Sequence, residues 1–265
     1  MAGDPLLQAT TALEGLARYW WPLCRTLALF ATAPGFGHRA LGVRARVLLA
    51  LVLTGALGGV LPPAPTLEPL SAPGVVATLE QIAVGVLLGL SLQLVFAVFS
   101  LVGDLVSTLL GLSMAVYNDP LNGVSSSSAI YQLYFILLML LFLAIDGHLL
   151  VVSVLYKSFL YWPVGSGLHY AGMDALLGGL GWMFAAALLI ALPMVVCMSL
   201  VQFGFGLLNR ISPALNLFSL GFPAAVVIGL ACLSLTLASL PGNYLELTRA
   251  TLDSLGNLLL EARDG

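Results

Sequence analysis

Five stretches of the chain are each long enough to cross a membrane and contain no charged side chain. They are residues 47–67, 81–103, 120–145, 175–209 and 211–245. A helix needs roughly 20 apolar residues to cross a hydrocarbon core about 30 Å thick. Only 8% of the 265 residues are charged, whereas an ordinary soluble domain carries about 25%. Lipid or protein partners must therefore cover this chain, and the pattern predicts a polytopic membrane protein.

Breaks between the apolar stretches predict where helices end. We expect an all-α integral membrane protein, a single membrane domain over residues 1–265, with about five or six long hydrophobic helices, several bent or broken into hairpins. Pro62, Pro63 and Pro65 are expected to end the second helix. Pro193 is expected to kink the fifth, because proline removes a helical hydrogen bond. The expected helices are near residues 13–30, 47–67, 81–110, 130–155, 175–209 and 214–245.

Three charged residues of the first apolar stretch share a helical face. Glu14 and Arg18 are four residues apart, and Arg25 follows after seven more, spacings that fall on one side of a helix. Glu14 can pair with Arg18, whereas Arg25 needs a partner elsewhere, since a charge at the bilayer centre costs about 2.5–3.5 kcal/mol. Two interpretations are open. The helix is interfacial and amphipathic, with Trp20 and Trp21 at the membrane interface, or its charged face docks against another subunit.

Small residues in the sequence suit packing rather than chemistry. Gly55 and Gly59, and again Gly85 and Gly89, have the spacing that lets helix backbones approach closely. Because glycine is common in membrane helices, we interpret both pairs as packing within the chain. The three cysteines are isolated in the sequence, which implies neither a disulfide framework nor a metal site.

The connection between the third and fourth expected helices is unusually apolar. Residues 111–132 read GLSMAVYNDPLNGVSSSSAIYQ, with a turn signal at Asn118, Asp119 and Pro120 and serines at 125–128. Two interpretations are open. The segment is a plain connection, or it folds into a protein-lined cavity, where irregular backbone is tolerated at membrane depth. In a cavity, methionine and small residues suit a seal that deforms around a passing chain.

Catalytic motifs do not occur in the sequence. It contains no HExxH, GxSxG or Walker pattern, and no GxGxxG at a strand–helix junction. A proton relay between Asp146 and His148 is conceivable, but a helix end that reaches headgroups or loop water explains both residues more simply. We therefore expect a protein that is not an enzyme and needs no cofactor or metal.

Eight sequence blocks, in order along most of the chain, carry a family resemblance. They are YWWPLCRTLALFATAP (19–34), GVRARVLLAL (42–51), QIAVGVLLGLSLQLVFA (81–97), GLSMAVYNDP (111–120), LLFLAIDGH (140–148), WPVG (162–165), ALP (191–193) and GLLNRISPALNLFSLGFP (206–223). The ordered set resembles the FliR family of flagellar biosynthetic proteins. The chain departs from the family pattern at Met114, Tyr117 and Asn118, where a more aromatic version is expected, and in the serine run.

The resemblance implies an export-gate subunit of the flagellar type III secretion apparatus. In that family, one FliR assembles with several copies of FliP and FliQ into a helical, ring-like hetero-oligomer whose pore passes unfolded flagellar proteins. Further expected partners are an FlhB-type export protein, the unfolded export substrates and membrane lipid, but no nucleic acid. The expected location is the bacterial inner membrane at the flagellar basal body, with part of the assembly raised toward the periplasm.

The resemblance and the helix breaks also give candidate site residues. By family similarity, the loop 111–125 corresponds to a plug that helps to close the pore, with Gly111, Leu112, Ser113, Met114, Tyr117, Asn118, Asp119 and Pro120 as its candidates. The candidate assembly and broken-helix residues are Arg18, Arg25, Asn209, Arg210, Pro213, Asn216, Gly221 and Pro223. Arg210 and the two asparagines are predicted to hydrogen-bond backbone groups freed at Pro213, shielded by neighbouring chains. A polar loop at the cytoplasmic surface is the alternative.

Two other functions stay open at this point. The injectisome SctT family shares the architecture and differs in exported substrate, although residues 206–223 are closer to the flagellar version. A stand-alone transporter or channel would show paired broken helices in two related halves. The sequence has one strong break, at 209–213, and no convincing second half.

Overall fold

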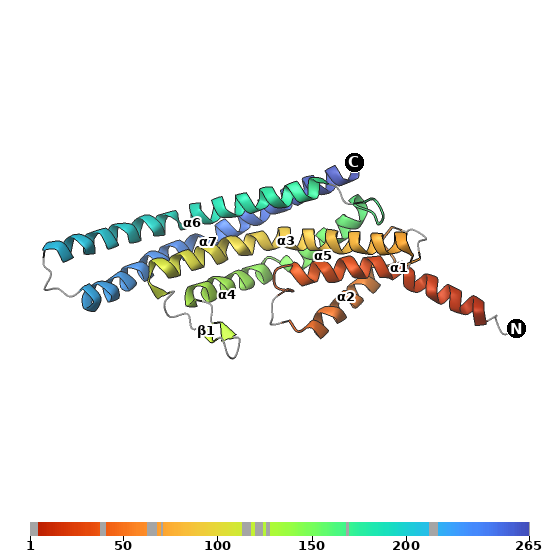
Figure 1. The fold of residues 1–265 in the computed structure, drawn as a ribbon, viewed down its shortest axis with the longest axis horizontal. Coiled ribbons are helices and arrows are strands. Elements are labelled where there is room, and N and C mark those ends of the chain that lie inside the picture. The colour runs from red at the N-terminus through yellow and green to blue at the C-terminus, as the bar shows by residue number, and fades with distance from the viewer. Residues whose placement is uncertain are drawn as a thin grey trace. The chain divides into compact units, whose positions relative to one another are not determined.

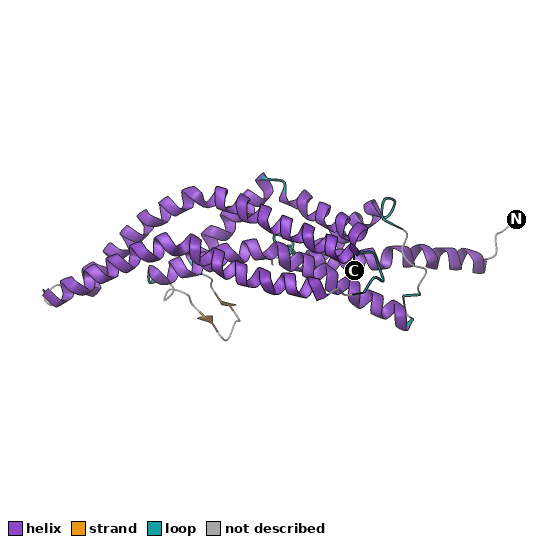
Figure 2. Cartoon of the chain, turned by 90° about the horizontal axis from the view of Figure 1, so that it is seen from above, coloured by secondary structure: helices purple, strands orange, loops and turns teal. Residues whose placement is uncertain are grey.

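The chain folds almost wholly into helices in a computed structural model (Figures 1 and 2). The structure describes all residues except 1–4, 38–40, 63–67, 70, 113–117, 120–123, 126–127, 168–169, 212–216 and 265. The helices are α1 (Pro5–Thr32), α2 (Val43–Leu57), α3 (Ala72–Leu109), α4 (Ala129–Ala144), α5 (Gly147–Tyr161), α6 (Tyr170–Ile211) and α7 (Leu217–Asp264). Two strands of two residues each, β1 (Asn118–Asp119) and β2 (Val124–Ser125), pair antiparallel.

Three of the described helices are long and apolar enough to cross a membrane. They are α3 and the segments Gly172–Ile211 of α6 and Gly221–Arg263 of α7. The pair α4 and α5 is a fourth candidate if it forms one broken span. The expectation of an all-α membrane protein with bent or broken helices is confirmed.

The break between α4 and α5 divides the expected run 130–155. Asp146 has a φ of 55°, and it is the one non-glycine residue with positive φ among the described residues. Aspartate tolerates this left-handed conformation better than most side chains. Its carbonyl oxygen then accepts hydrogen bonds from the backbone N–H groups of Leu149 and Leu150, at 2.9 and 3.2 Å. The conformation of one residue thus ends α4 and starts α5.

The prolines act differently from one another. Pro193, Pro223 and Pro241 lie inside α6 and α7, which continue through them. In contrast, α2 ends at Leu57, several residues before the proline run at 62–65 that was expected to end it. The difference has a local reason, because consecutive glycines, the poorest helix formers after proline, follow at 58 and 59.

The chain divides into two compact units. Unit 1 comprises Met1–Leu94, Ile145–Gly179 and Ala250–Gly265, and unit 2 comprises Val95–Ala144 and Leu180–Arg249. In unit 1, α1 packs against α2 and α3 (Figure 1). The glycines Gly85 and Gly89 of α3 allow this packing, since a Cβ at Gly85 would lie 2.8 Å from that of Ala28 in α1. For this pair, packing within the chain is confirmed, whereas Gly55 and Gly59 have open space beside them.

Unit 2 has an aromatic core. The ring of Phe96 in α3 meets the rings of Phe135, Phe142 and Tyr244 edge-on, with centroids 6.0–6.4 Å apart. Phe99, one turn further along α3, also contacts Tyr244 at 6.3 Å. Such edge-to-face pairs are each worth about 0.5–1.5 kcal/mol beyond their buried area. These rings join α3, α4 and α7 within the unit.

Candidate functional site

Arg25 of α1 lies fully buried in unit 1, with 0% of its surface exposed. Its guanidinium donates hydrogen bonds in three directions. Nε donates to Oε1 of Gln81 at 2.8 Å, Nη1 to the carbonyl oxygen of Ser158 at 2.9 Å, and Nη2 to that of Trp162 at 2.8 Å. The planar fork of arginine suits several fixed acceptors at once. One α1 residue is thereby bonded to α3, to α5 and to the residue that follows α5.

The arginine caps the C-terminus of α5. The last carbonyl groups of a helix have no partner inside the helix and carry partial negative charge. Ser158 stands in the last turn of α5 and Trp162 is its C-cap residue, so both carbonyl groups lie at this negatively polarised end, and that of Ser158 also accepts a hydrogen bond from the backbone N–H of Trp162. The guanidinium also lies over the ring of Phe159, 4.2 Å from its centroid, within the range of a cation–π interaction. The burial of the charge is therefore compensated by several polar contacts.

A second chain of contacts extends from Gln81 to the loop after α5. The Nε2 group of Gln81 donates to Oε1 of Glu80 at 3.3 Å, and the same carboxylate oxygen accepts from the backbone N–H of Gly165 at 3.2 Å. The indole N–H of Trp162 donates to the carbonyl oxygen of Gly167 at 2.9 Å. Both glycines have a φ of +88°, which L side chains rarely adopt. We call the set Arg25, Glu80, Gln81, Ser158, Phe159, Trp162, Gly165 and Gly167 the Arg25 network.

The Arg25 network brings together three of the sequence blocks that carried the resemblance. Arg25 comes from the block 19–34, Gln81 opens the block 81–97, and Trp162 opens the block 162–165. Neither interpretation made for Arg25 from the sequence describes this arrangement, because its hydrogen-bond partners are in its own chain. No sequence signal pointed to Gln81 or Ser158, which are 56 and 133 residues away.

The residues that precede Arg25 in α1 differ in their exposure. Trp20 is 43% exposed and its indole N–H donates to the hydroxyl of Thr78 at 3.1 Å, whereas Trp21 is buried. An interfacial location therefore suits Trp20 and not Trp21. The side chain of Arg18, the other predicted assembly residue of α1, lies outside the described residues.

The expected plug loop lies mostly outside the described residues, namely at Ser113, Met114, Tyr117 and Pro120. Gly111 and Leu112 follow α3 directly and are half-buried. Gly111 has a φ of +73°, and a Cβ there would lie 3.1 Å from the ring of Phe222 in the same unit. Asn118 and Asp119 form β1 and pair with β2. The serine run ends at Ser128, whose hydroxyl accepts a hydrogen bond from the backbone N–H of Tyr131 and caps α4.

The predicted assembly residues of the 206–223 block lie at the ends of α6 and α7. Asn209 and Arg210 are exposed in the last turn of α6, which ends at Ile211. Pro213 and Asn216 lie outside the described residues. Gly221 and Pro223 lie within the continuous helix α7, so the helix is not interrupted at either residue. The structure thus separates the block into two helix ends, with the break between Ile211 and Leu217.

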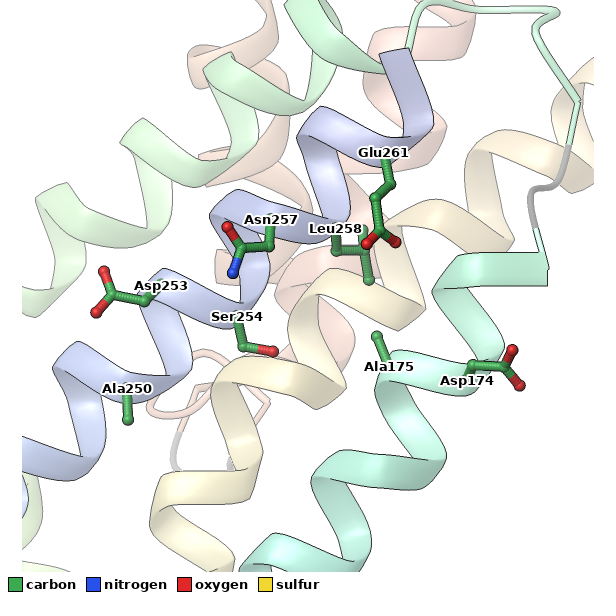
Figure 3. Close-up of a pocket in the computed structure, with 8 residues that line it drawn as sticks. All are labelled: Asp174, Ala175, Ala250, Asp253, Ser254, Asn257, Leu258 and Glu261. Atoms are coloured by element: carbon green, nitrogen blue, oxygen red, sulfur yellow. The ribbon is translucent and has the colours of Figure 1, made fainter. Parts of the chain in front are cut away.

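An open groove of about 740 Å³ lies between α6 and α7 within unit 1 (Figure 3). It is lined by Asp174, Ala175, Ala250, Asp253, Ser254, Asn257, Leu258 and Glu261. The three carboxylates are spread along it and do not converge on one point (Figure 3). Among the described residues, no group of three or more His, Cys, Asp or Glu could hold a metal ion. The groove therefore has the character of a polar surface and not of a metal centre.

Two cysteines that are isolated in the sequence are neighbours in unit 2. The Sγ atoms of Cys197 in α6 and Cys232 in α7 lie 2.7 Å apart. Their separation of 35 residues gives no local motif, so the sequence could not reveal the pair. Cys24, in unit 1, is the third cysteine.

Comparison with known proteins places the chain in a family. Residues 16–251 match the family described as "Bacterial export proteins, family 1". The flagellar biosynthetic protein FliR of Pectobacterium carotovorum is 34% identical over 93% of this chain and 94% of its own length. The FliR protein of Escherichia coli K12 is 32% identical over 86% and 88%, and that of Bacillus subtilis 26% over 89% and 92%. The chain therefore belongs to family 1 of the bacterial export proteins, the family of the flagellar biosynthetic protein FliR.

Proposed function

We propose that this chain is the FliR-type subunit of the flagellar protein export gate in the bacterial inner membrane. It assembles with FliP and FliQ homologues into a hetero-oligomer that conducts unfolded flagellar proteins, with an FlhB-type protein as a further partner. Family membership supports the export role. The carrying observation is the length of the exposed apolar surface on α6.

The exposed apolar surface of α6 is longer than a bilayer can cover. Large apolar side chains are exposed along α6 from Leu177 to Leu208, over a stretch without a charged residue. At 1.5 Å per residue this band is about 46 Å long. A hydrocarbon core is about 30 Å thick, and a tilt of 40°, at the upper end of the usual range, extends the covered length to only about 39 Å. The remainder needs another protein surface, as a subunit of a gate would have.

The Arg25 network bears on which contacts a partner has to make. Because the buried charge of unit 1 is satisfied inside the chain, the unit does not need a partner to compensate Arg25. What partners have to cover are the exposed apolar residues of the chain. We therefore expect partner contacts to follow the exposed apolar residues, with the ends of α6 and α7 near Arg210 as an additional polar contact.

Native mass measurement tests the assembly directly. The chain carries an affinity tag and is co-expressed with the FliP and FliQ homologues of its own genome, then purified in mild detergent. We expect one hetero-oligomer that contains all three proteins. A stable, active monomer or homodimer of this chain would instead favour the stand-alone transporter. Restored swimming in a bacterium that lacks its own FliR would separate the flagellar role from that of the injectisome.

A substitution at Arg210 tests whether the end of α6 contributes to assembly. We expect Arg210→Ala to reduce co-purification of the partners while membrane insertion of the chain stays unchanged. Arg249→Ala is the matched control, since Arg249 is also exposed but lies within α7. Equal loss of insertion and assembly in the Arg210 variant would contradict a contact with neighbouring chains.

The plug is a second part of the proposal. By family similarity, the loop 111–125 helps to seal the pore when export is idle. Deletion of residues 114–125 should make the assembled gate leak small ions, measured as potassium efflux from cells that express the whole complex. A deletion variant that assembles and stays as tight as the intact complex would show that the seal lies elsewhere.

A further inference from the structure

The pair Cys197 and Cys232 is a chemical feature that the export role does not use. The two Sγ atoms are 2.7 Å apart, with each side chain half-buried. Cys197 lies in α6 and Cys232 in α7, both within unit 2, so they precede and follow the segment that links the two helices. Two thiols in direct contact are placed to react with each other.

Close packing of the two helices holds the cysteines at this distance. Gly229 lies one turn before Cys232 in α7, and a Cβ there would lie 3.2 Å from the Sδ atom of Met198, the residue after Cys197. The same Cβ would clash with the side chain of Leu110, the residue that follows α3. The absence of a side chain at Gly229 therefore lets α7 approach α6 at the level of the two thiols.

We propose that Cys197 and Cys232 form an oxidation site, which a disulfide-class oxidant converts into an intrachain disulfide between α6 and α7. One thiol, as its thiolate, attacks the oxidant disulfide and releases one reduced thiol, which leaves a mixed disulfide on the chain. The second cysteine then attacks that mixed disulfide and releases the other reduced thiol. In sum, the two cysteine thiols lose two protons and two electrons and form one S–S bond, and the S–S bond of the oxidant is broken as it takes them up and leaves as two thiols.

The bond would close a loop that contains the break between α6 and α7. A disulfide restricts the unfolded chain more strongly when it closes a longer loop, and the two cysteines are separated by 35 positions in the sequence. Oxidation would thus fix the helix pair without a partner chain. The inference stands on the thiol geometry of unit 2 and does not depend on the proposed export function.

Peptide mass mapping of the oxidised chain after proteolysis, without reduction, tests the site. Membranes that contain the full-length chain with its partners are treated with 2,2′-dipyridyl disulfide, an apolar oxidant that reaches membrane helices. Peptides with Cys197 and Cys232 should then be joined, with a loss of two hydrogen atoms and no retained pyridylthio group. Pyridylthio groups retained on both residues, unreacted thiols at both, or a disulfide between two copies of the chain would overturn the proposal.

Single variants separate an intrachain pair from two independent thiols. The Cys197→Ser chain lacks the second attacking thiol, so Cys232 should keep one pyridylthio group. The Cys24→Ser chain is the matched control and should still form the joined product, since Cys24 lies in the other unit. Loss of the joined product in the Cys24→Ser chain would also overturn the assignment.

Discussion

The two compact units of this chain differ in the kind of contact that stabilises each one internally. Unit 1 is organised around a buried charge, with Arg25 bonded to acceptors on α3, on α5 and after α5. Unit 2 is organised around apolar rings, with Phe96 at the centre of Phe135, Phe142 and Tyr244. Directional hydrogen bonds fix the arrangement of helices in the first unit, whereas shape and volume fix it in the second.

The difference teaches where each unit tolerates change. A buried polar network is stable only when every member is satisfied, so unit 1 should be sensitive even to conservative substitutions. An apolar core accepts hydrophobic replacements of similar volume at a cost usually below about 1.5 kcal/mol. The following substitutions test this contrast in the co-purified complex.

The largest effect is expected at Arg25. Arg25→Met takes the arginine donor away from the buried acceptors of Gln81, Ser158 and Trp162, and each buried polar group that loses its hydrogen-bond partner costs about 1–3 kcal/mol. The thermal unfolding midpoint of the complex should fall accordingly, by about 2–4 °C per kcal/mol. Arg44→Met, at an exposed position of α2, is the control and should leave the midpoint unchanged.

Arg25→Lys sharpens the same test. Lysine keeps the positive charge but lacks the planar fork, so the variant should recover only part of the lost stability. A lysine variant as stable as the original chain would mean that charge alone, and not the three-way geometry, organises unit 1.

A smaller effect is expected where α3 packs on α1. Gly85→Ala places a methyl group against Ala28 and the backbone of α1, and overpacking of this kind costs about 1–3 kcal/mol. Gly55→Ala, in open space on α2, should instead raise stability by about 0.5–1 kcal/mol, since alanine favours helix. The unfolding midpoints of the two variants should therefore move in opposite directions. Equal shifts would show that close approach at Gly85 is not needed.

The smallest effect is expected in the aromatic core of unit 2. Phe96→Leu removes the edge-to-face contacts but keeps most of the apolar volume, so its cost should stay below about 1.5 kcal/mol. Glu246→Gln, at an exposed polar position of α7 in the same unit, is the control and should cost nothing measurable in the unfolding midpoint. If Phe96→Leu destabilises the complex more than Arg25→Lys does, the contrast between the units is wrong.

Much of the fold could be predicted from the sequence, because a segment that lies in lipid must be both uncharged and helical. Residues 81–103 and 175–209 are uncharged and fall within α3 and α6, since a helix satisfies its own backbone groups in an apolar surrounding. The division of the run 130–155 was readable only in part, because Asp146 was interpreted as a helix end while one helix was expected over the whole run. It depends on the backbone conformation of Asp146, which a local sequence of apolar residues and one aspartate does not specify.

The candidate site, too, could be predicted from the sequence only in part. Arg25 was singled out as a charge in need of a partner, and the structure supplies that partner within the chain. The plug residues and the assembly role of Arg210 stay predictions. The exposed position of Arg210 agrees with a partner contact as well as with a polar surface, and only the assembly experiment separates these.

The amino-acid sequence by itself determined that this chain is a helical membrane protein of the export family. It did so because hydropathy and ordered motifs are local properties, readable one segment at a time. The tertiary structure alone decided that Arg25 caps α5, that α1 packs closely against α3 at Gly85, and that Cys197 contacts Cys232. Each of these contacts joins residues far apart in the chain, and their proximity depends on how helices pack, which no single segment encodes.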